Sequence, residues 1–310
     1  MLAKIIIPYF GTLPWWINFF LLSCKYNKGI FWTIFTDSST EGLICPDNVC
    51  FNKTNFSDYK KLVASRLGID FTPENPVKLC DVKPFLGFIH PEEITGFKYW
   101  GFSDIDVIYG DISDYLKKIK FWNVISFHDE RLSGHLAFFK NLSHINEIPF
   151  KHPEWYIHLR NEEYVGFDEY YLSGFLSDRF FTPPRAARFT NKLQPPWLVR
   201  IIKKIRFKEE FTTPFTGRPW RDSTLFENQP SEWHWNKGVV YACRDMMKSP
   251  YLHLMNFKKS QWNTNRLAPW DDVSKVSRFE VTEETQEFYI SQKGISRSLR
   301  YSNNEGSCPD

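Results

Sequence analysis

The stretch YWGFSDIDVIYGDISDYL, residues 99–116, places four aspartates within and after an apolar run that is typical of a buried β-strand. A buried carboxylate is costly unless positive charge meets it, so Asp104 and Asp106 need a cationic partner. Two like charges this close also raise each other's pKa. A divalent cation that prefers oxygen ligands, Mg²⁺ or Mn²⁺, would satisfy both aspartates and would also take substrate phosphates. The alternative is that Asp104 and Asp106 are a cap and a surface residue.

Two earlier apolar runs predict a parallel sheet. AKIIIPYFG, residues 3–11, and GIFWTIFTDSS, residues 29–39, read as buried strands, with helical patterns over residues 14–25 and 56–68. Alternating strands and helices indicate an α/β fold, a mostly parallel sheet with flanking helices. Ligands of such sheets bind beyond the carboxyl ends of the strands. We therefore expect Pro8–Gly11, Thr36–Asp37 and Asp104–Asp106 to meet at one edge.

Composition limits the classes of function. A net charge of +3 is too small for the electrostatic footprint of a nucleic-acid-binding protein, so no nucleic-acid partner is expected. The aromatic content of 18% suits stacking sites for bases or sugars, a membrane-facing surface or an aromatic-rich core. Six cysteines lack CxxC spacing, and residues 13–24 are too few to span a bilayer, which takes about 20. Without a secretory signal, a cytoplasmic location is expected.

A late segment supplies further ligands for a metal and a diphosphate. YLHLMNFKKSQW, residues 251–262, places His253 near the end of a strand, with Lys258, Lys259 and Trp262 after it. Histidine binds Mn²⁺ and lysine binds phosphate, so a nucleoside diphosphate derivative is the expected substrate. A lone histidine is otherwise most often structural.

Several motifs together resemble a known family. IIIPYFG, WTIFTD, KLCDVKP, YWGFSDIDVIYGDI, SGHLAFFKN and GFDE occur in this order in bacterial glycosyltransferase-like proteins found with polysaccharide biosynthesis genes. The resemblance spans residues 4–175 and, more loosely, continues to residue 262. The pattern is also similar to GT-A enzymes, especially those of glycosyltransferase family eight.

The resemblance implies one GT-A-like domain over residues 1–265, with a nucleotide-sugar half (1–125), an acceptor half (126–265) and a partly flexible C-terminal extension (266–310). It implies transfer of a sugar, such as a hexose, from a UDP-sugar to a growing, lipid-linked bacterial surface polysaccharide, as in capsule or O-antigen synthesis. Retention of the sugar's configuration is suggested by family eight, and inversion stays open.

The resemblance also assigns donor-side residues. In such enzymes an early strand and a Thr-Asp pair hold the nucleoside, a D-x-D holds the metal, and a late His–Lys–Trp segment closes over the diphosphate. Lys83 would reach the phosphates or orient the D-x-D, and the uridine contacts would be Pro8, Tyr9, Thr36 and Asp37. The metal ligands would be Asp104, Asp106 and His253. The family's Lys-Pro-Trp is absent from HLMNFKKSQW, so either Lys258 or Lys259 would bind the diphosphate.

On the acceptor side, SGHLAFFKN would form the floor where donor sugar and acceptor meet. Gly134 would allow close approach and His135 would offer a hydrogen bond. GFDE places Asp168 and Glu169 at the start of a helix, where one would hold a sugar hydroxyl or act as the base of an inverting enzyme. The alternative for both is N-terminal helix capping.

PPWLVRIIKKIRFKEEF, residues 195–211, spaces apolar residues helically between lysines and arginines. This pattern is typical of an amphipathic helix lying on an anionic membrane surface, which predicts peripheral attachment at the inner face of the cytoplasmic membrane. A helix packed on the domain with a solvated basic face is the alternative.

Two other functions stay open. FSDIDVI is also compatible with the nucleophile strand of a haloacid-dehalogenase-type phosphatase, in which Asp104 attacks phosphorus, Asp106 is the acid/base and Asp271–Asp272 hold Mg²⁺. Such a strand normally opens the domain, whereas two strands precede it here. A non-catalytic scaffold at the membrane surface is the other alternative, and the presence of Asp104, Asp106 and His253 argues against it.

Overall fold

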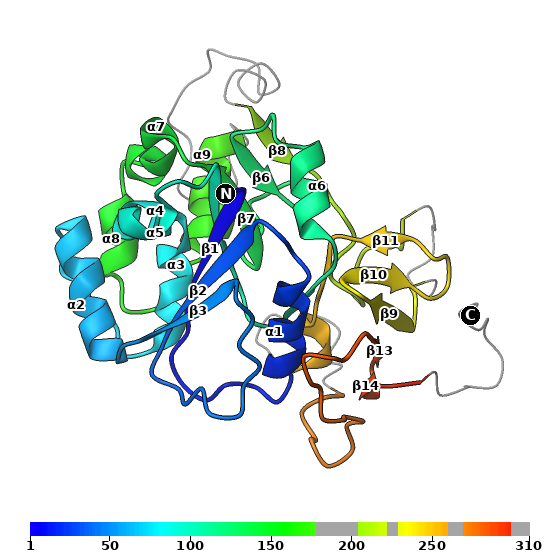
Figure 1. Cartoon of the computed structure of the whole chain (residues 1–310). Coiled ribbons are helices and arrows are strands. Elements are labelled where there is room, and N and C mark those ends of the chain that lie inside the picture. Colours follow the sequence, from blue (N-terminus) through cyan, green and yellow to red (C-terminus); the bar gives the residue numbers. More distant parts are fainter. Residues whose placement is uncertain (178–203, 222–228, 260–268, 299–310) are drawn as a thin grey trace.

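The computed structural model describes residues 1–177, 204–221, 229–259 and 269–298 (Figure 1). Within these ranges, seven strands form a large sheet in the order β3-β2-β1-β4-β7-β6-β8. Their bounds are β1 (Ala3–Pro8), β2 (Ile30–Thr36), β3 (Val49–Lys53), β4 (Tyr99–Ser103), β6 (Val124–Ser126), β7 (Leu136–Lys140) and β8 (Ile205–Phe207). β1 to β4 run parallel, and only β7 of these seven strands runs against the others. The predicted α/β class with a mostly parallel sheet is confirmed.

Helices cover both faces of the large sheet (Figure 1). One face packs against α1 (Ile17–Lys25) and α6 (Ile112–Lys118). The other face packs against α2 (Phe56–Leu67), α3 (Leu79–Val82), α4 (Leu86–Ile89), α5 (Pro91–Ile94), α7 (Ser143–Asn146), α8 (Trp155–Arg160) and α9 (Ser173–Ser177). Short 3-10 turns are η1 (Pro76–Lys78), η2 (Lys83–Phe85), η3 (Ile148–Lys151) and η6 (Met255–Phe257), and η4 (Phe167–Leu172) is a π-helix.

Burial on both faces explains why the strands are apolar without alternation. In β1, Ile5 and Ile7 join the core beneath α1, whereas Ile6 joins the core beneath α2. A strand covered on both sides needs an apolar residue at every position. In the segment KLCDVKP, Pro84 lies in the first turn of η2 and breaks residues 76–89 into short helical pieces.

The D-x-D lies where the chain leaves the large sheet. Residues 98–110 are predicted as one strand, but β4 ends at Ser103 and β5 (Val107–Tyr109) pairs instead with β12 (Tyr251–His253). The amide of Asp104 still donates to the carbonyl of His135 beside β4, whereas the carbonyl of Asp106 accepts from the amide of Leu254. The aspartates therefore occupy the turn between two sheets, and β12 brings His253 beside them.

A second, antiparallel sheet has the order β11-β10-β9-β13-β14. Its strands are β9 (Glu232–Asn236), β10 (Val239–Ala242), β11 (Lys248–Ser249), β13 (Glu287–Ser291) and β14 (Gly294–Ser296). Trp233 and Trp235 of β9 are fully buried in the core shared with α1. β13 and β14 come from the predicted C-terminal extension and β13 pairs with β9. The domain boundary at residue 265 stays a prediction.

The helix predicted over residues 195–211 is wrong in its described part. Residues 195–203 lie outside the described residues, and Ile205–Phe207 form β8, which pairs in parallel with β6. Ile205 is buried in the core, and Arg206 pairs with Glu210 at 2.7 Å. Pairing at the sheet edge overrides the helical pattern because it buries Ile205 and satisfies the backbone.

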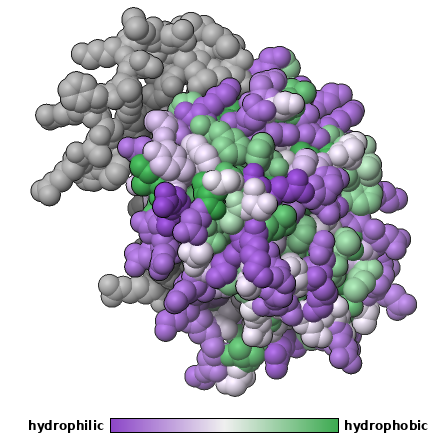
Figure 2. All heavy atoms as spheres, turned by 90° about the vertical axis from the view of Figure 1, so that its left-hand side faces the viewer, coloured by the Kyte–Doolittle hydropathy of each residue, from purple (hydrophilic) through white to green (hydrophobic). Residues whose placement is uncertain are grey.

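No helix within the described ranges is long and apolar enough to cross a membrane. Figure 2 shows the side of the molecule over which α2 and α8 lie, and there hydrophilic residues are interspersed with smaller hydrophobic groups.

Candidate active site

A cavity of about 1090 Å³ lies beyond the carboxyl ends of β1 and β4. Parallel sheets bind ligands at this edge. The residues that the sequence analysis selected and that line it are Pro8, Tyr9, Lys83, Asp104, Asp106, Gly134, His135, Asp168, Glu169, His253, Lys258 and Lys259. Thr36 and Asp37 are outside this lining. Most of the selected residues are therefore brought together.

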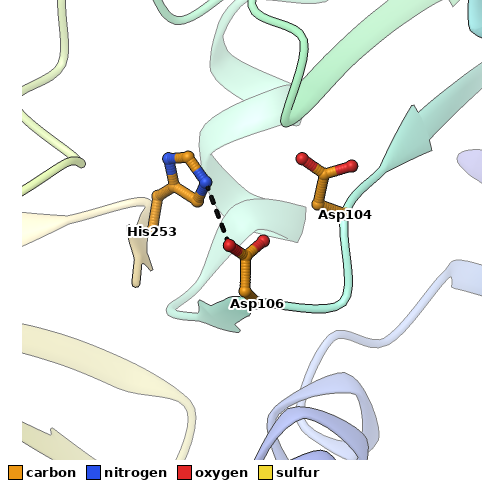
Figure 3. Close-up of side chains that lie close together, drawn as sticks. All are labelled: Asp104, Asp106 and His253. Carbon is orange, nitrogen blue, oxygen red and sulfur yellow. Dashed lines mark ion pairs between the residues drawn. The ribbon is translucent and has the colours of Figure 1, made fainter. Parts of the chain in front are cut away.

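Asp104, Asp106 and His253 form a group with the geometry of a cation site. Figure 3 shows the three side chains converging from the β4–β5 turn and from β12. One ligand atom from each lies within 4.8 Å of the others, and His253 Nε2 is 3.4 Å from Asp106 Oδ2. Asp106 is only 3% exposed, and its Oδ1 is buried with no hydrogen-bond partner among the described residues. An unpaired buried carboxylate oxygen is costly, so the group fits a divalent cation.

Each aspartate of the D-x-D is paired with its own lysine. Lys83 Nζ donates to Asp104 Oδ1 at 2.6 Å and to the carbonyl of Gly134 at 2.7 Å. Lys258 Nζ lies 2.7 Å from Asp106 Oδ2. Burial alone would raise the pKa of Asp106, but Lys258 and His253 hold it well below its ordinary value. Asp106 is therefore arranged to stay ionised.

Lys258 and Lys259, the two candidate lysines for binding the diphosphate, differ in their surroundings. Burial alone would lower the pKa of Lys258, but the carboxylate of Asp106 raises it. Lys259 is exposed, and its backbone amide donates to Asp271 Oδ1 at 2.6 Å. Trp262 lies outside the described residues. Of Lys258 and Lys259, it is therefore Lys258 that contacts the D-x-D, through Asp106.

The backbone and the ring of His253 are both held in place. The backbone amide donates to the carbonyl of Thr212 at 2.7 Å, and the ring Nδ1 lies 3.1 Å from Thr213 Oγ1. His135 stacks on it, with ring centroids 4.0 Å apart and an interplanar angle of 14°. His135 Nε2 lies 2.8 Å from the hydroxyl of Tyr251. Burial, and then the nearby His253, lower the pKa of His135 well below its ordinary value, so this ring is neutral.

A second pair of carboxyl groups, Asp168 and Glu169, also lines the cavity. Gly166, at φ +73°, precedes the π-helix η4, which presents Asp168 and Glu169. The amide of Gly134 donates to Glu169 Oε1 at 3.2 Å. A Cβ at Gly134 would lie 2.8 Å from Glu169 Oε1 and 3.1 Å from Asp168 Oδ2, so no larger residue fits without displacing these groups. Burial, and then the charge of Glu169, raise the pKa of Asp168 well above its ordinary value.

The loops after β1 and β2 are tied to each other. Tyr9 is half-buried, and its hydroxyl donates to the carbonyl of Thr12 at 2.8 Å. Asp37 Oδ1 accepts from the amide of Gly11 at 3.0 Å, and Thr36 Oγ1 accepts from the amide of Ser38 at 3.1 Å. The predicted uridine contacts of these residues stay predictions. Asp37 ties the loop after β2 to the loop after β1, and Thr36 bonds within the loop after β2, both outside the cavity lining.

A further charged group at the cavity, around Arg218, was not predicted from the sequence. Arg218 pairs with Asp129 at 2.8 Å and with Glu209 at 3.5 Å. His128, Asp129 and Glu209 have ligand atoms close enough for a cation, but Arg218 already neutralises the two carboxylates. The run HDER, residues 128–131, predicts a polar turn. Nothing in the sequence predicts that this turn pairs with residues 209–218.

The arrangement required by a haloacid-dehalogenase-type phosphatase does not form in the described part of the chain. Asp271 accepts from the amide of Lys259, and Asp272 pairs with Lys275 at 2.8 Å. Neither aspartate lines the cavity or joins the group around Asp106.

The model of one protein family, a family of unknown function (DUF6625), matches residues 5–296. No curated protein matches the sequence. Among solved structures, the galactosyltransferase LgtC in complex with donor and acceptor sugar analogs is similar over 53% of this chain and 68% of that chain, at 12% identity and a TM-score of 0.33. An active-site mutant of LgtC is similar over 72% of this chain and 91% of that chain, at 13% identity and a TM-score of 0.28. Likeness this weak carries no assignment of function. The family match, in contrast, spans nearly the whole chain, which therefore belongs to the DUF6625 family.

Proposed function

We propose that this protein is a metal-dependent glycosyltransferase that moves a sugar, such as a hexose, from a UDP-sugar to a glycan acceptor. The observation that carries the proposal is the buried Oδ1 of Asp106, which has no hydrogen-bond partner among the described residues and belongs to the group formed with Asp104 and His253. The geometry supports a cation and a diphosphate at this edge of the sheet. The sequence motifs support sugar transfer as the reaction.

On the donor side, Asp104, Asp106 and His253 would hold Mn²⁺ or Mg²⁺ through two carboxylates and one imidazole. The bound cation would supply positive charge beside the departing diphosphate. Lys258 would exchange its contact with Asp106 for a diphosphate oxygen, since a second cation at that carboxylate releases the ammonium. Lys259 would add charge from the rim. Pro8, Tyr9, Thr36 and Asp37 would contact the uridine.

On the acceptor side, Asp168 and Glu169 would hold the hydroxyl that attacks the donor sugar. Asp168 is suited to exchange a proton because burial keeps its pKa well above the ordinary value. Lys83 and Gly134 would couple the two sides, since Lys83 bonds Asp104 and the Gly134 carbonyl, and the Gly134 amide bonds Glu169. His135 would support the ring of His253 and face the sugar from its exposed edge.

For the acceptor, we propose a surface polysaccharide intermediate attached to a lipid and met at the inner face of the cytoplasmic membrane. The support is the basic and apolar content of residues 195–204, together with the sequence resemblance. No nucleic acid takes part in this proposal.

The proposal is tested by a binding screen of UDP-, GDP- and TDP-sugars with Mn²⁺, followed by NMR of the product formed with glycan acceptors. We expect Mn²⁺-dependent binding of UDP-sugars and a new glycosidic bond, whose anomeric configuration reports retention or inversion. Hydrolysis of simple phosphomonoesters without any nucleotide-sugar binding would instead support a phosphatase.

A further inference from the structure

The motif KLCDVKP contains two charged residues that the cavity does not use. Lys78 and Asp81 pair at 2.9 Å, and both side chains are fully buried. Burying a charge pair has a desolvation penalty that a pair of apolar residues of similar volume avoids, so such a pair is weak evidence for stability. The contacts that this pair makes therefore indicate another role.

The pair bonds four backbone groups of one segment. Lys78 Nζ donates to the carbonyls of His158 at 2.7 Å and Glu163 at 2.8 Å. Asp81 Oδ2 accepts from the amide of Val165 at 3.0 Å, and Oδ1 accepts from the amide of Phe167 at 2.7 Å. These groups extend from His158 in α8, through the connecting loop, to Phe167 at the start of η4.

This segment leads directly into the acceptor-side carboxyl pair. Phe167, which bonds Asp81, is adjacent to Asp168 at the start of η4. On the other side of the same short helical turns, Cys80 and Lys83 line the cavity, and Lys83 bonds Asp104. Residues 78–83 therefore contact both the D-x-D, through Lys83, and the segment that leads into Asp168, through Lys78 and Asp81.

We propose that Lys78 and Asp81 are positioning residues that fix Asp168 and Glu169 relative to the D-x-D. The inference rests on the proposed function for its kinetic consequence, but its structural consequence is independent of any activity. Glu169 accepts from the amide of Gly134, so protection of that amide from solvent exchange reports whether Glu169 is in place.

The test uses the double variant Lys78→Met/Asp81→Leu, which removes both charges and keeps apolar packing. Four backbone groups lose their partners in this variant, so its thermal midpoint should fall. At a temperature at which circular dichroism shows it folded, it should bind Mn²⁺ and UDP within about twofold of the wild type. Turnover of the transfer reaction should fall on the order of 10²-fold with the donor KM unchanged, because a misplacement of about 1 Å costs that much. In ¹⁵N-glycine-labelled protein, the Gly134 amide should exchange at least about tenfold faster.

Two further variants make the result specific. Lys78→Met/Asp81→Asn keeps an acceptor for the amide of Phe167 and should recover part of the turnover and of the Gly134 protection. Lys4→Met/Glu93→Leu removes another ion pair, at 3.1 Å and largely buried, which joins β1 to α5 outside the cavity lining. This control should leave both readouts unchanged.

Wild-type turnover and wild-type Gly134 protection in Lys78→Met/Asp81→Leu would overturn the proposal. So would a fall of UDP binding as large as the fall of turnover in the folded variant, which would make the pair merely structural. If the wild type transfers no sugar, the proposed function fails and the Gly134 amide decides the inference alone. Lost protection at Gly134, while the Gly110 amide bonded to the Pro250 carbonyl keeps its protection, supports it, and retained protection at Gly134 overturns it.

Discussion

Replacing Lys258 by methionine is expected to move metal affinity and nucleotide affinity in opposite directions. Lys258 Nζ lies 2.7 Å from Asp106 Oδ2 and therefore competes with any cation for that carboxylate. Methionine keeps most of the length of the side chain and removes the charge. Mn²⁺ should bind the variant more tightly, whereas UDP should bind its Mn²⁺ complex more weakly because the diphosphate loses an ammonium.

The size of both effects follows from one charge-assisted hydrogen bond. Such a bond contributes about 1.5–3 kcal/mol, and each 1.4 kcal/mol changes an affinity about tenfold. The Lys258 side chain is 33% exposed, so solvent screening favours the lower end. We expect Mn²⁺ affinity to rise about tenfold and UDP affinity at saturating Mn²⁺ to fall by a similar factor.

Mn²⁺ affinity is measured from the EPR signal of the free ion, and UDP affinity by isothermal titration calorimetry at saturating Mn²⁺. Lys259→Met is the matched control, since the Lys259 side chain is exposed and makes no ion pair with the D-x-D. It should leave Mn²⁺ affinity unchanged. A fall in the Mn²⁺ affinity of Lys258→Met, or an increase in Lys259→Met instead, would refute the reasoning.

Three further outcomes are expected. Gly134→Ala places a Cβ 2.8 Å from Glu169 Oε1 and 3.1 Å from Asp168 Oδ2, so these two side-chain ends should shift and sugar transfer should fall at least about tenfold in a product assay with little change of the urea midpoint, and wild-type transfer would contradict this. Asp168→Asn should reduce transfer roughly 10²–10⁴-fold in a product assay while UDP and Mn²⁺ bind normally, whereas lost UDP binding would move Asp168 to the donor side. Burial lowers the pKa of His90 to about 4. The pKa of His90 in the unfolded chain is about 6.5, so between pH 6.5 and pH 4 only the unfolded chain binds the proton. The free energy of unfolding should therefore fall by about 3 kcal/mol as the pH falls from about 6.5 to about 4. His90→Gln should flatten this pH dependence of the free energy of unfolding, and an equal pH dependence in the wild type and the variant would show that His90 does not cause it.

The sequence was sufficient for the centre of the fold and of the site because the signals there are local. Runs such as Ile5–Ile7 are apolar at consecutive positions rather than alternating ones, which is typical of strands buried on both faces. The closeness of Asp104 and Asp106 follows from their spacing alone, and so does their need for positive charge. That the charge comes from Lys83 and Lys258 depends on contacts across the fold.

Elsewhere the pattern permitted two structures, and distant contacts selected one. Ile205 and Phe207 fit both a helical and an alternating pattern, and pairing with β6 selects the strand. The exit of β5 from the large sheet depends on β12, which is more than 140 residues further along the chain. The bonds of Lys78 and Asp81 to residues 158–167 likewise join segments that no local periodicity connects.

The central claim is that Asp104, Asp106 and His253 bind a divalent cation that in turn binds a nucleoside diphosphate. The most direct measurement is calorimetric titration of UDP into the wild type and into Asp106→Asn, each with and without Mn²⁺, with circular dichroism to show that both fold. The account predicts that the wild type binds UDP far more tightly with Mn²⁺, and that Asp106→Asn loses this dependence while staying folded. Equal UDP affinity with and without Mn²⁺ in the wild type, or an unchanged Mn²⁺ dependence in Asp106→Asn, would contradict it.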